Sequence, residues 1–256
     1  IDDMRPRTRT FGALRDLSYA VKGGRVPRSK KLLADLLKIT PVLTTTPDGF
    51  VRSGGLFFGR EEAIQTLLGK LREHNLITLV GRSGSGKSSV VAAGLIPALR
   101  RRADGRTWSI RSLRPGPEPL HALVRCFDPP PVDLPPFEAD QRVEQQVAIL
   151  RTDEHALARR IRSFLATAEE TGTDWLLLHI DQWEELYTQA LRNLALDPEL
   201  AERDVTQFIN LLLKATRTSP CTIVLTVRAD FYGEFLKHGA LAAAVPPGQL
   251  NLGPRR

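Results

Sequence analysis

Residues 76–88 read Leu76-Ile77-Thr78-Leu79-Val80-Gly81-Arg82-Ser83-Gly84-Ser85-Gly86-Lys87-Ser88. The part from Gly81 to Ser88 matches the pattern G-x-x-x-x-G-K-[ST] at every defined position. The apolar run Leu76–Val80 before it predicts a buried strand, and a helix is predicted over Lys87–Arg102. A strand, a glycine-rich loop and a helix in this order are typical of a phosphate-binding P-loop.

The residue types of this loop suit phosphate chemistry. Glycines let the backbone curl so that successive N–H groups point inward, and the helix that begins there adds its positive end. Lys87 is expected to contact the β- and γ-phosphates of a nucleotide, and the Ser88 hydroxyl to ligate Mg²⁺. A Gly-Ser turn that merely opens a helix is the structural alternative. The loop residues predicted to bind nucleotide are Gly81, Ser83, Gly84, Ser85, Gly86, Lys87, Ser88 and Ser89.

Outward from this stretch, apolar runs alternate with helical patterns. The further predicted strands are Trp108–Leu113, Trp175–Ile180, Thr222–Val227 and a short Gln249–Leu252. The predicted helices are Glu138–Leu150, Asp153–Glu170, Glu184–Leu196 and Pro198–Arg217, with a proline-rich loop over Asp128–Pro136. Nearly continuous apolar strands separated by helices indicate an α/β fold whose parallel sheet is covered on both faces.

The most apolar strand ends in an acid, Asp181, as a Walker B segment does. A carboxylate at the carboxyl edge of a parallel sheet reaches the ligand crevice, so Asp181 is predicted to hold Mg²⁺ directly or through a water. Glu184 or Glu185 is predicted to orient or deprotonate the attacking water, and the sequence does not choose between them. The alternative is that both acids only favour a helix dipole. His179 is interpreted as a packed strand residue.

The strand Thr222–Val227 also ends in polar residues, Arg228 and Asp230. If this strand lies between the first and third strands, the Arg228 guanidinium points at the γ-phosphate region and can sense whether that phosphate is present. The alternative is an exposed arginine that pairs with Asp230.

Composition places the chain among ordinary globular proteins, with 42% hydrophobic and 25% charged residues. No apolar run is long enough for a transmembrane helix, no secretory signal is recognisable, and two cysteines are too few for a disulfide framework, so a cytoplasmic protein is expected. The net charge is +7, but residues 1–40 hold ten Lys or Arg against four Asp or Glu. That segment could contact nucleic acid, or it could be a solvated linker.

Residues 1–54 are expected to form a basic N-terminal segment and linker, the tail of an upstream region, with one amphipathic helix over Ser29–Ile39. The stretch from Pro41 to Gly55 is rich in Pro, Thr and Gly and is interpreted as linker. Residues 55–256 are expected to be the nucleotide-binding core.

Five motifs in this order resemble the NTPase domain of the novel STAND group, signal-transduction ATPases related to the AAA+ and NB-ARC families. They are Leu56-Phe57-Phe58-Gly59-Arg60-Glu61, the P-loop, Trp108 through Arg114-Pro115-Gly116, Asp181-Gln182-Trp183-Glu184-Glu185-Leu186, and Leu225-Thr226-Val227-Arg228-Ala229-Asp230-Phe231. The likeness covers roughly residues 56–254.

The resemblance implies a P-loop NTPase sandwich with sheet order 5-1-4-3-2, and it implies that Phe58, Gly59 and Arg60 contact adenine and ribose. Relatives often carry a Glu where this chain has Ala63. The resemblance further implies an ATP-dependent switch that self-associates when activated, with C-terminal sensor repeats and a plausible role in bacterial defence. Leu250 to Pro254 resembles the junction at which relatives begin their lid and winged-helix domains. Closure of such domains supplies much of phosphoryl-transfer catalysis, so this core without them is expected to hydrolyse ATP slowly.

Several other functions compete with an ATPase switch. A GTPase would need an Asn/Thr-Lys-x-Asp motif, and the chain has neither an Asn-Lys nor a Thr-Lys pair. Another alternative is a P-loop kinase or a helicase-like enzyme. A kinase would need an acceptor site and an arginine-rich lid, and neither is clear in this sequence. A nucleic-acid-binding module would rest on residues 1–40. A scaffold that binds nucleotide without hydrolysis is disfavoured by the intact acids Asp181, Glu184 and Glu185.

Overall fold

The structure is a computed structural model, and its chain divides into two compact units, Ile1–Glu61 and Glu62–Arg256. The residues described are 11–13, 42–45, 51–53, 60–101, 106–131, 133–168, 172–188 and 198–253. The expected helix over Ser29–Ile39 and the residues Phe58 and Gly59 lie outside these ranges. No described helix is long and apolar enough to cross a membrane.

The first unit contains a three-stranded antiparallel sheet of β1 (Phe11–Ala13), β2 (Val42–Thr45) and β3 (Val51–Ser53). Strands β2 and β3 fall in the stretch interpreted as linker. Their β-branched valines and threonines favour extended pairing, and this preference competes with the turn residues on which the linker interpretation relied. The boundary expected at residue 54 stays a prediction.

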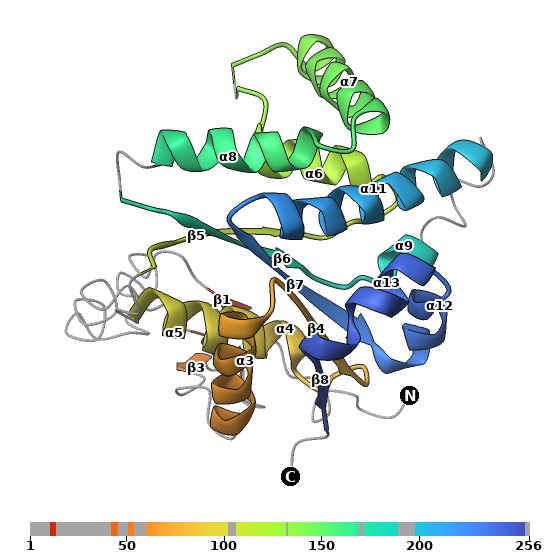
Figure 1. The fold of residues 1–256 in the computed structure, drawn as a ribbon. Coiled ribbons are helices and arrows are strands. Elements are labelled where there is room, and N and C mark those ends of the chain that lie inside the picture. The colour runs from red at the N-terminus through yellow and green to blue at the C-terminus, as the bar shows by residue number, and fades with distance from the viewer. Residues whose placement is uncertain are drawn as a thin grey trace, which may run out of the picture. The chain divides into compact units, whose positions relative to one another are not determined.

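The second unit is built on a five-stranded parallel sheet, shown in Figure 1. Its strands are β4 (Leu76–Gly81), β5 (Trp108–Leu113), β6 (Trp175–Ile180), β7 (Cys221–Arg228) and β8 (Gln249–Leu252). The order across the sheet is β5-β6-β7-β4-β8, and every adjacent pair is parallel. The expected order 5-1-4-3-2 is therefore confirmed, with β7 between the P-loop strand and the strand that ends at Asp181.

Burial explains why these strands take the centre of the molecule. All six residues of β4 are buried, and so are the first seven of β7, whereas most of edge strand β5 is only partly buried. Strands that are apolar on both sides must be covered on both faces.

Helices cover both faces of the sheet (Figure 1). On one side lie α3 (Glu61–Glu73) and one continuous helix made of α4 (Lys87–Ser89), a π-helical stretch (Val90–Leu95) and α5 (Ile96–Arg101). On the other side lie α6 (Pro119–Phe127), α8 (Ala156–Ala168) and α11 (Pro198–Thr218), with α7 (Pro136–Thr152) packed outside α6. The α/β sandwich predicted from the sequence is thus confirmed.

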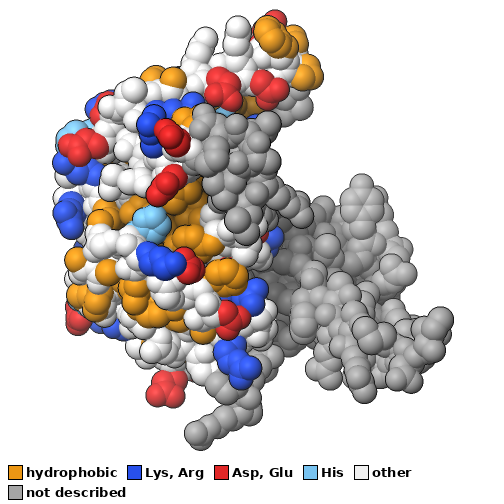
Figure 2. Space-filling model, turned by 90° about the vertical axis from the view of Figure 1, so that its right-hand side faces the viewer, with side chains coloured by type: hydrophobic (Ala, Val, Ile, Leu, Met, Phe, Trp, Pro, Cys, Tyr) orange, Lys and Arg blue, Asp and Glu red, His pale blue; other side chains and the backbone are white. Residues whose placement is uncertain are grey.

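Three further short helices, α9 (Glu185–Thr188), α12 (Tyr232–Leu236) and α13 (Gly239–Ala244), lie close together near the carboxyl end of β7 (Figure 1). Apolar side chains gather over the face that these helices form, as Figure 2 shows. At these helices the ring of Tyr187 in α9 stacks with Phe231, just before α12, at 6.5 Å and with His238, just before α13, at 6.4 Å between centroids. Of the helix predicted over Glu184–Leu196, the structure describes only the first turn as far as Thr188.

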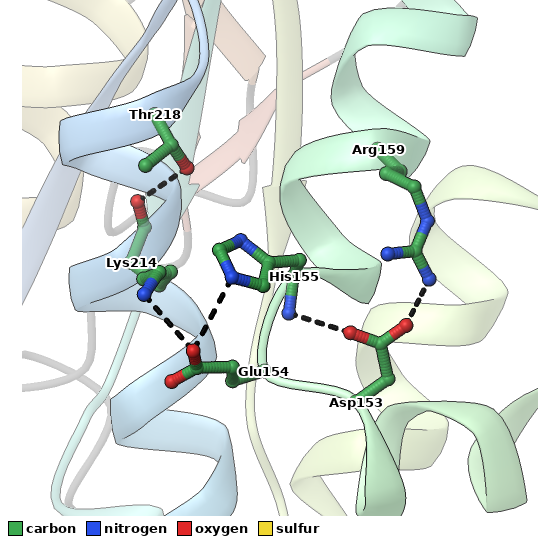
Figure 3. A network of polar contacts seen from close by, with 6 residues as sticks. All are labelled: Asp153, Glu154, His155, Arg159, Lys214 and Thr218. Atoms are coloured by element: carbon green, nitrogen blue, oxygen red, sulfur yellow. Dashed lines mark hydrogen bonds and ion pairs between the residues drawn. The ribbon is translucent and has the colours of Figure 1, made fainter.

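The turn between α7 and α8 is fixed by a network of charged side chains, drawn in Figure 3. Asp153 accepts a hydrogen bond from the His155 backbone N–H at 2.8 Å, and it forms an ion pair with Arg159. Glu154 accepts from Lys214 Nζ of α11 at 3.0 Å. Because the Asp153 carboxylate accepts from the His155 N–H, these residues form a turn, and α8 begins at Ala156 and not at the predicted Asp153.

Gly248 lies directly before β8, against the first strand of the core. A Cβ on Gly248 would stand 1.9 Å from the Leu76 carbonyl oxygen, a backbone atom that cannot move aside. Only a residue without a side chain lets β8 approach β4 in this register.

We predict that Gly248→Ala lowers the free energy of unfolding by roughly 1–3 kcal/mol, the usual range for overpacking a core. Gly69→Ala is the matched control, because a Cβ at Gly69 in α3 meets nothing within 4 Å. Alanine there should leave stability unchanged or raise it slightly. Urea unfolding of both variants checks this; equal midpoints would contradict the close approach.

Candidate functional site

The loop after β4 has the backbone that phosphate binding requires. Gly84 and Gly86 take positive φ angles of 73° and 88°, which residues with a Cβ seldom adopt. Gly86 precedes the first turn of α4, and its carbonyl accepts from the Val90 N–H at 2.8 Å. The loop therefore curls so that its amides and the start of the helix face one point.

Gly81 is needed for a different reason, namely crowding at the end of β4. A Cβ there would lie 2.7 Å from Ser85 Oγ and 2.9 Å from the Leu252 carbonyl oxygen on β8. The first glycine of the motif thus lets the loop fold back over the adjoining strand.

The Lys87 side chain lies along the loop. Its Nζ donates to the carbonyl oxygens of Gly81 at 2.8 Å and Arg82 at 3.1 Å. Burial lowers the pKa of Lys87; the Glu184 carboxylate opposes this and the Arg228 guanidinium adds to it. Groups from three strand ends therefore act on one ammonium.

The Asp181 carboxylate connects the P-loop helix to the centre of the sheet. Its Oδ1 accepts hydrogen bonds from Ser88 Oγ at 2.7 Å and from Thr226 Oγ1 of β7 at 2.6 Å. The Asp181 backbone N–H donates to the Leu113 carbonyl of β5 at 2.9 Å. The predicted metal pair, Ser88 and Asp181, is thus brought into direct contact.

This pair fits Mg²⁺ in its chemistry. A hydroxyl and a carboxylate are hard oxygen donors, and Mg²⁺ commonly binds to one or two such groups while waters and phosphate oxygens complete its shell. Within the described ranges no group of three or more His, Cys, Asp or Glu side chains could hold a metal ion. Two protein oxygens leave the rest of the Mg²⁺ shell to waters and phosphate oxygens, so this donor set suits a metal that arrives with nucleotide.

The segment after Asp181 is anchored by a buried indole. Trp183 is fully buried, with its ring centroid 5.8 Å from that of Phe208 and 5.5 Å from that of Phe235. Its Nε1 donates to Tyr187 Oη at 2.9 Å, and its backbone N–H donates to the Thr226 carbonyl at 3.0 Å. The acids on either side of Trp183 are consequently held in place by the core.

The two candidate glutamates face different strands. Glu184 Oε2 accepts from the backbone N–H of Arg228, at the end of β7, at 3.2 Å. Glu185 faces the other way, where its Oε1 can accept from the Gln182 side-chain amide at 2.9 Å. Glu184 is therefore the one of the two glutamates whose charge acts on Lys87.

Arg228 stands where the sensor hypothesis needs it, because β7 lies between β4 and β6. Its Nη2 nevertheless donates to Asp230 Oδ2 at 2.7 Å, and its guanidinium carbon lies 5.2 Å from the Phe231 ring centroid. The ion pair considered as the alternative is thus formed, and the sensor role stays a prediction.

Two other predicted residues have different outcomes. His179 is a buried residue of β6 whose Nε2 lies 3.8 Å from Asp181 Oδ1, and burial lowers its pKa. The packed-strand interpretation is confirmed. Arg60 is described just before α3, but the adenine contact expected for Phe58, Gly59 and Arg60 stays a prediction.

The sequence interpretation gave no role to three residues that join the site: Arg114, Gln182 and Thr226. Arg114 follows the last residue of β5, and its Nε lies 3.9 Å from Asp181 Oδ2. The rule that selected Asp181 and Arg228, a polar residue at the carboxyl end of a parallel strand, would also have selected Arg114.

Comparisons with known proteins find two families. The chain matches the family described as Novel STAND NTPase 1 over residues 51–256, and an uncharacterised DegV family over residues 1–85. A DegV domain-containing protein, YteA of Lactococcus lactis, is 32% identical over 73 residues, which are 28% of this chain and 25% of that protein. The chain thus spans about a quarter of this curated relative.

Two solved structures are similar to the chain. A Walker-type ATPase of Pyrococcus abyssi is 18% identical, with 77% of this chain and 53% of that chain covered and a TM-score of 0.43. A chain from the HORMA–CdnC–Trip13 complex of E. coli MS115-1 is 14% identical, with 96% and 69% covered and a TM-score of 0.38. The match over residues 51–256 takes in the P-loop, Asp181 and Arg228 together, and the chain belongs to the novel STAND NTPase 1 family.

Proposed function

We propose that this domain binds ATP with Mg²⁺ and hydrolyses it slowly, as the nucleotide switch of a larger signalling protein. The observation that carries the proposal is the Asp181 carboxylate, which accepts from the P-loop Ser88 and from Thr226 at the same oxygen. This contact supports the proposal, because it joins the two proposed metal ligands beside the P-loop of a domain that belongs to an NTPase family.

Each residue has a defined role in the proposed reaction. The loop amides and Lys87 bind the β- and γ-phosphates, while Ser88 and Asp181 hold the metal. Mg²⁺, when bound, neutralises charge on the phosphate oxygens. Glu184 orients the attacking water, since it lies among the groups that act on Lys87, whereas Glu185 faces Gln182. Arg228 exchanges its Asp230 partner for the γ-phosphate.

Adenine is the proposed base, read by Phe58, Gly59 and Arg60, because the chain lacks the Asn/Thr-Lys-x-Asp pattern of guanine-binding proteins. Self-association on activation, C-terminal sensor repeats, a cytoplasmic location and a role in bacterial defence extend the proposal on the strength of the family resemblance.

The first prediction of the proposed function concerns Lys87→Ala, compared with the exposed Lys237→Ala as control. Calorimetric titration with ATP, ADP and GTP should show adenine nucleotide binding to the wild type and to the control. Because Lys87→Ala lacks the ammonium, its affinity for ATP should fall by about tenfold or more, which is ~1.4 kcal/mol of binding free energy. Equal ATP affinity of Lys87→Ala and Lys237→Ala would show that Lys87 does not bind the phosphates. Tighter binding of GTP than of ATP would show that the adenine assignment is wrong.

The second prediction separates the two glutamates by single-turnover hydrolysis. Glu184→Gln should keep nucleotide affinity and lower the hydrolysis rate by about 100-fold, because the amide cannot accept the water proton. Glu185→Gln should change the rate by at most about threefold, because the half-buried Glu185 contacts Gln182 and not the groups around Lys87. If the larger loss occurs in Glu185→Gln, the assignment of the water to Glu184 is wrong.

A further inference from the structure

The turn after Asp181 contains an unusual backbone. Gln182 has a φ of 56°, and among the described residues it is the one non-glycine with positive φ. Residues with a Cβ adopt this left-handed conformation rarely, and it persists only where the surroundings enforce it. The contacts of Gln182 therefore show which residues enforce this conformation.

On its inner side the turn is held by β7. The Gln182 backbone N–H donates to Thr226 Oγ1 at 3.0 Å, and the Trp183 N–H donates to the Thr226 carbonyl at 3.0 Å. The same Thr226 hydroxyl donates to Asp181 at 2.6 Å. One threonine thus contacts three successive residues of the segment.

On its outer side the turn is held by Arg114. With the Gln182 amide oxygen turned toward β5, Arg114 Nη2 donates to it at 3.0 Å, and the Gln182 amide nitrogen donates to Glu185 Oε1 at 2.9 Å. Arg114 Nε also lies 3.9 Å from Asp181 Oδ2, the carboxylate oxygen that Ser88 and Thr226 leave free. Arg114 therefore contacts the metal-site acid and the strained residue at once.

The turn sets two directions within four residues. Asp181 points to Ser88 on the P-loop helix, and Glu184 points to the Arg228 N–H at the end of β7. A relaxed φ at Gln182 would rotate the chain that follows it, so Asp181 and Glu184 could no longer keep these two contacts at the same time.

We propose that Arg114 and Gln182 form a clamp that positions Asp181 for the metal and Glu184 for the water. This inference rests on the proposed function, and both are positioning residues because they act through the acids beside them. Charge alone makes the opposite prediction: a cation this close to Asp181 repels Mg²⁺, so its removal would strengthen metal binding. The sign of the change therefore separates the two explanations.

The variants that test the clamp are Arg114→Ala, Arg114→Lys and Gln182→Gly, with the exposed Arg142→Ala on α7 as control. The Arg114 side chain is 59% exposed, so its loss should not unfold the core. In Gln182→Gly the backbone can keep its positive φ, but the amide bridge is lost. ATP affinity is measured in EDTA and in Mg²⁺, together with the single-turnover rate.

In Arg114→Ala and Gln182→Gly, ATP affinity in EDTA should stay within about twofold of wild type. Their gain in affinity on adding Mg²⁺ and their hydrolysis rate should each fall by about 10-fold or more, as for other groups that orient a metal ligand. Arg114→Lys should recover part of both losses. An unchanged or larger Mg²⁺ gain in Arg114→Ala overturns the clamp, and so does an equal loss of affinity in EDTA.

If the wild-type chain binds no nucleotide, the proposed function fails and the clamp is tested by NMR. The backbone amide signals of Gln182 and Glu185 should then shift in Arg114→Ala, while those of Gly84 and Gly86 stay in place. Unshifted Gln182 and Glu185 signals overturn the clamp.

Discussion

The rest of the site depends on one carboxylate oxygen, Asp181 Oδ1, which accepts hydrogen bonds from two hydroxyls at 2.7 and 2.6 Å. One hydroxyl, on Ser88, belongs to the helix that leaves β4, and the other, on Thr226, belongs to β7. Three segments that are far apart in sequence are thereby joined at one atom. This geometry is available only because β7 lies between β4 and β6.

The strand order also decides which charges meet. The carboxyl ends of β5, β6 and β7 deliver Arg114, Asp181 and Arg228 to one edge of the sheet, and the loop after β4 delivers Lys87. Acids and bases form ion pairs at this edge, as in the pairs Arg114–Asp181 and Arg228–Asp230. These ion pairs balance the charges within the chain. In the proposed nucleotide-bound state, phosphates and metal would replace these internal partners.

Much of the second unit follows from local patterns. Three of the five strands have the predicted bounds, and the other two differ by one residue at one or both ends. The central strands β4, β6 and β7 are recognisable because strands buried on both faces are apolar nearly throughout. The P-loop and Asp181 were recognisable because their chemistry needs fixed residue types at fixed spacing. Helices α3 and α6 were missed: α3 follows the motif taken as the start of order, and α6 lies between a strand and a proline-rich loop. The order of the strands came from the family resemblance.

Contacts between distant residues were beyond the reach of those patterns. Nothing local in Glu184-Glu185 says that the first faces Arg228 and the second faces Gln182, since that depends on the backbone of Gln182. The threonine that bridges Asp181 and the turn reads as an ordinary strand residue. For Arg228, the sequence predicted its position at the end of a strand. It did not decide between a γ-phosphate contact and the ion pair with Asp230 that the structure contains.

The most direct measurement of the central claim is electron paramagnetic resonance of Mn²⁺ in place of Mg²⁺, with ATP, in wild type and Asp181→Asn. We expect the wild type to bind about one Mn²⁺ per chain when ATP is present, because Ser88 and Asp181 are proposed to hold the metal, Asp181 directly or through a water. In Asp181→Asn the bound metal should fall by about tenfold or more, while ATP still binds in EDTA. Equal Mn²⁺ binding by wild type and Asp181→Asn would show that metal binding does not depend on the Asp181 carboxylate, and the proposed metal site would be wrong.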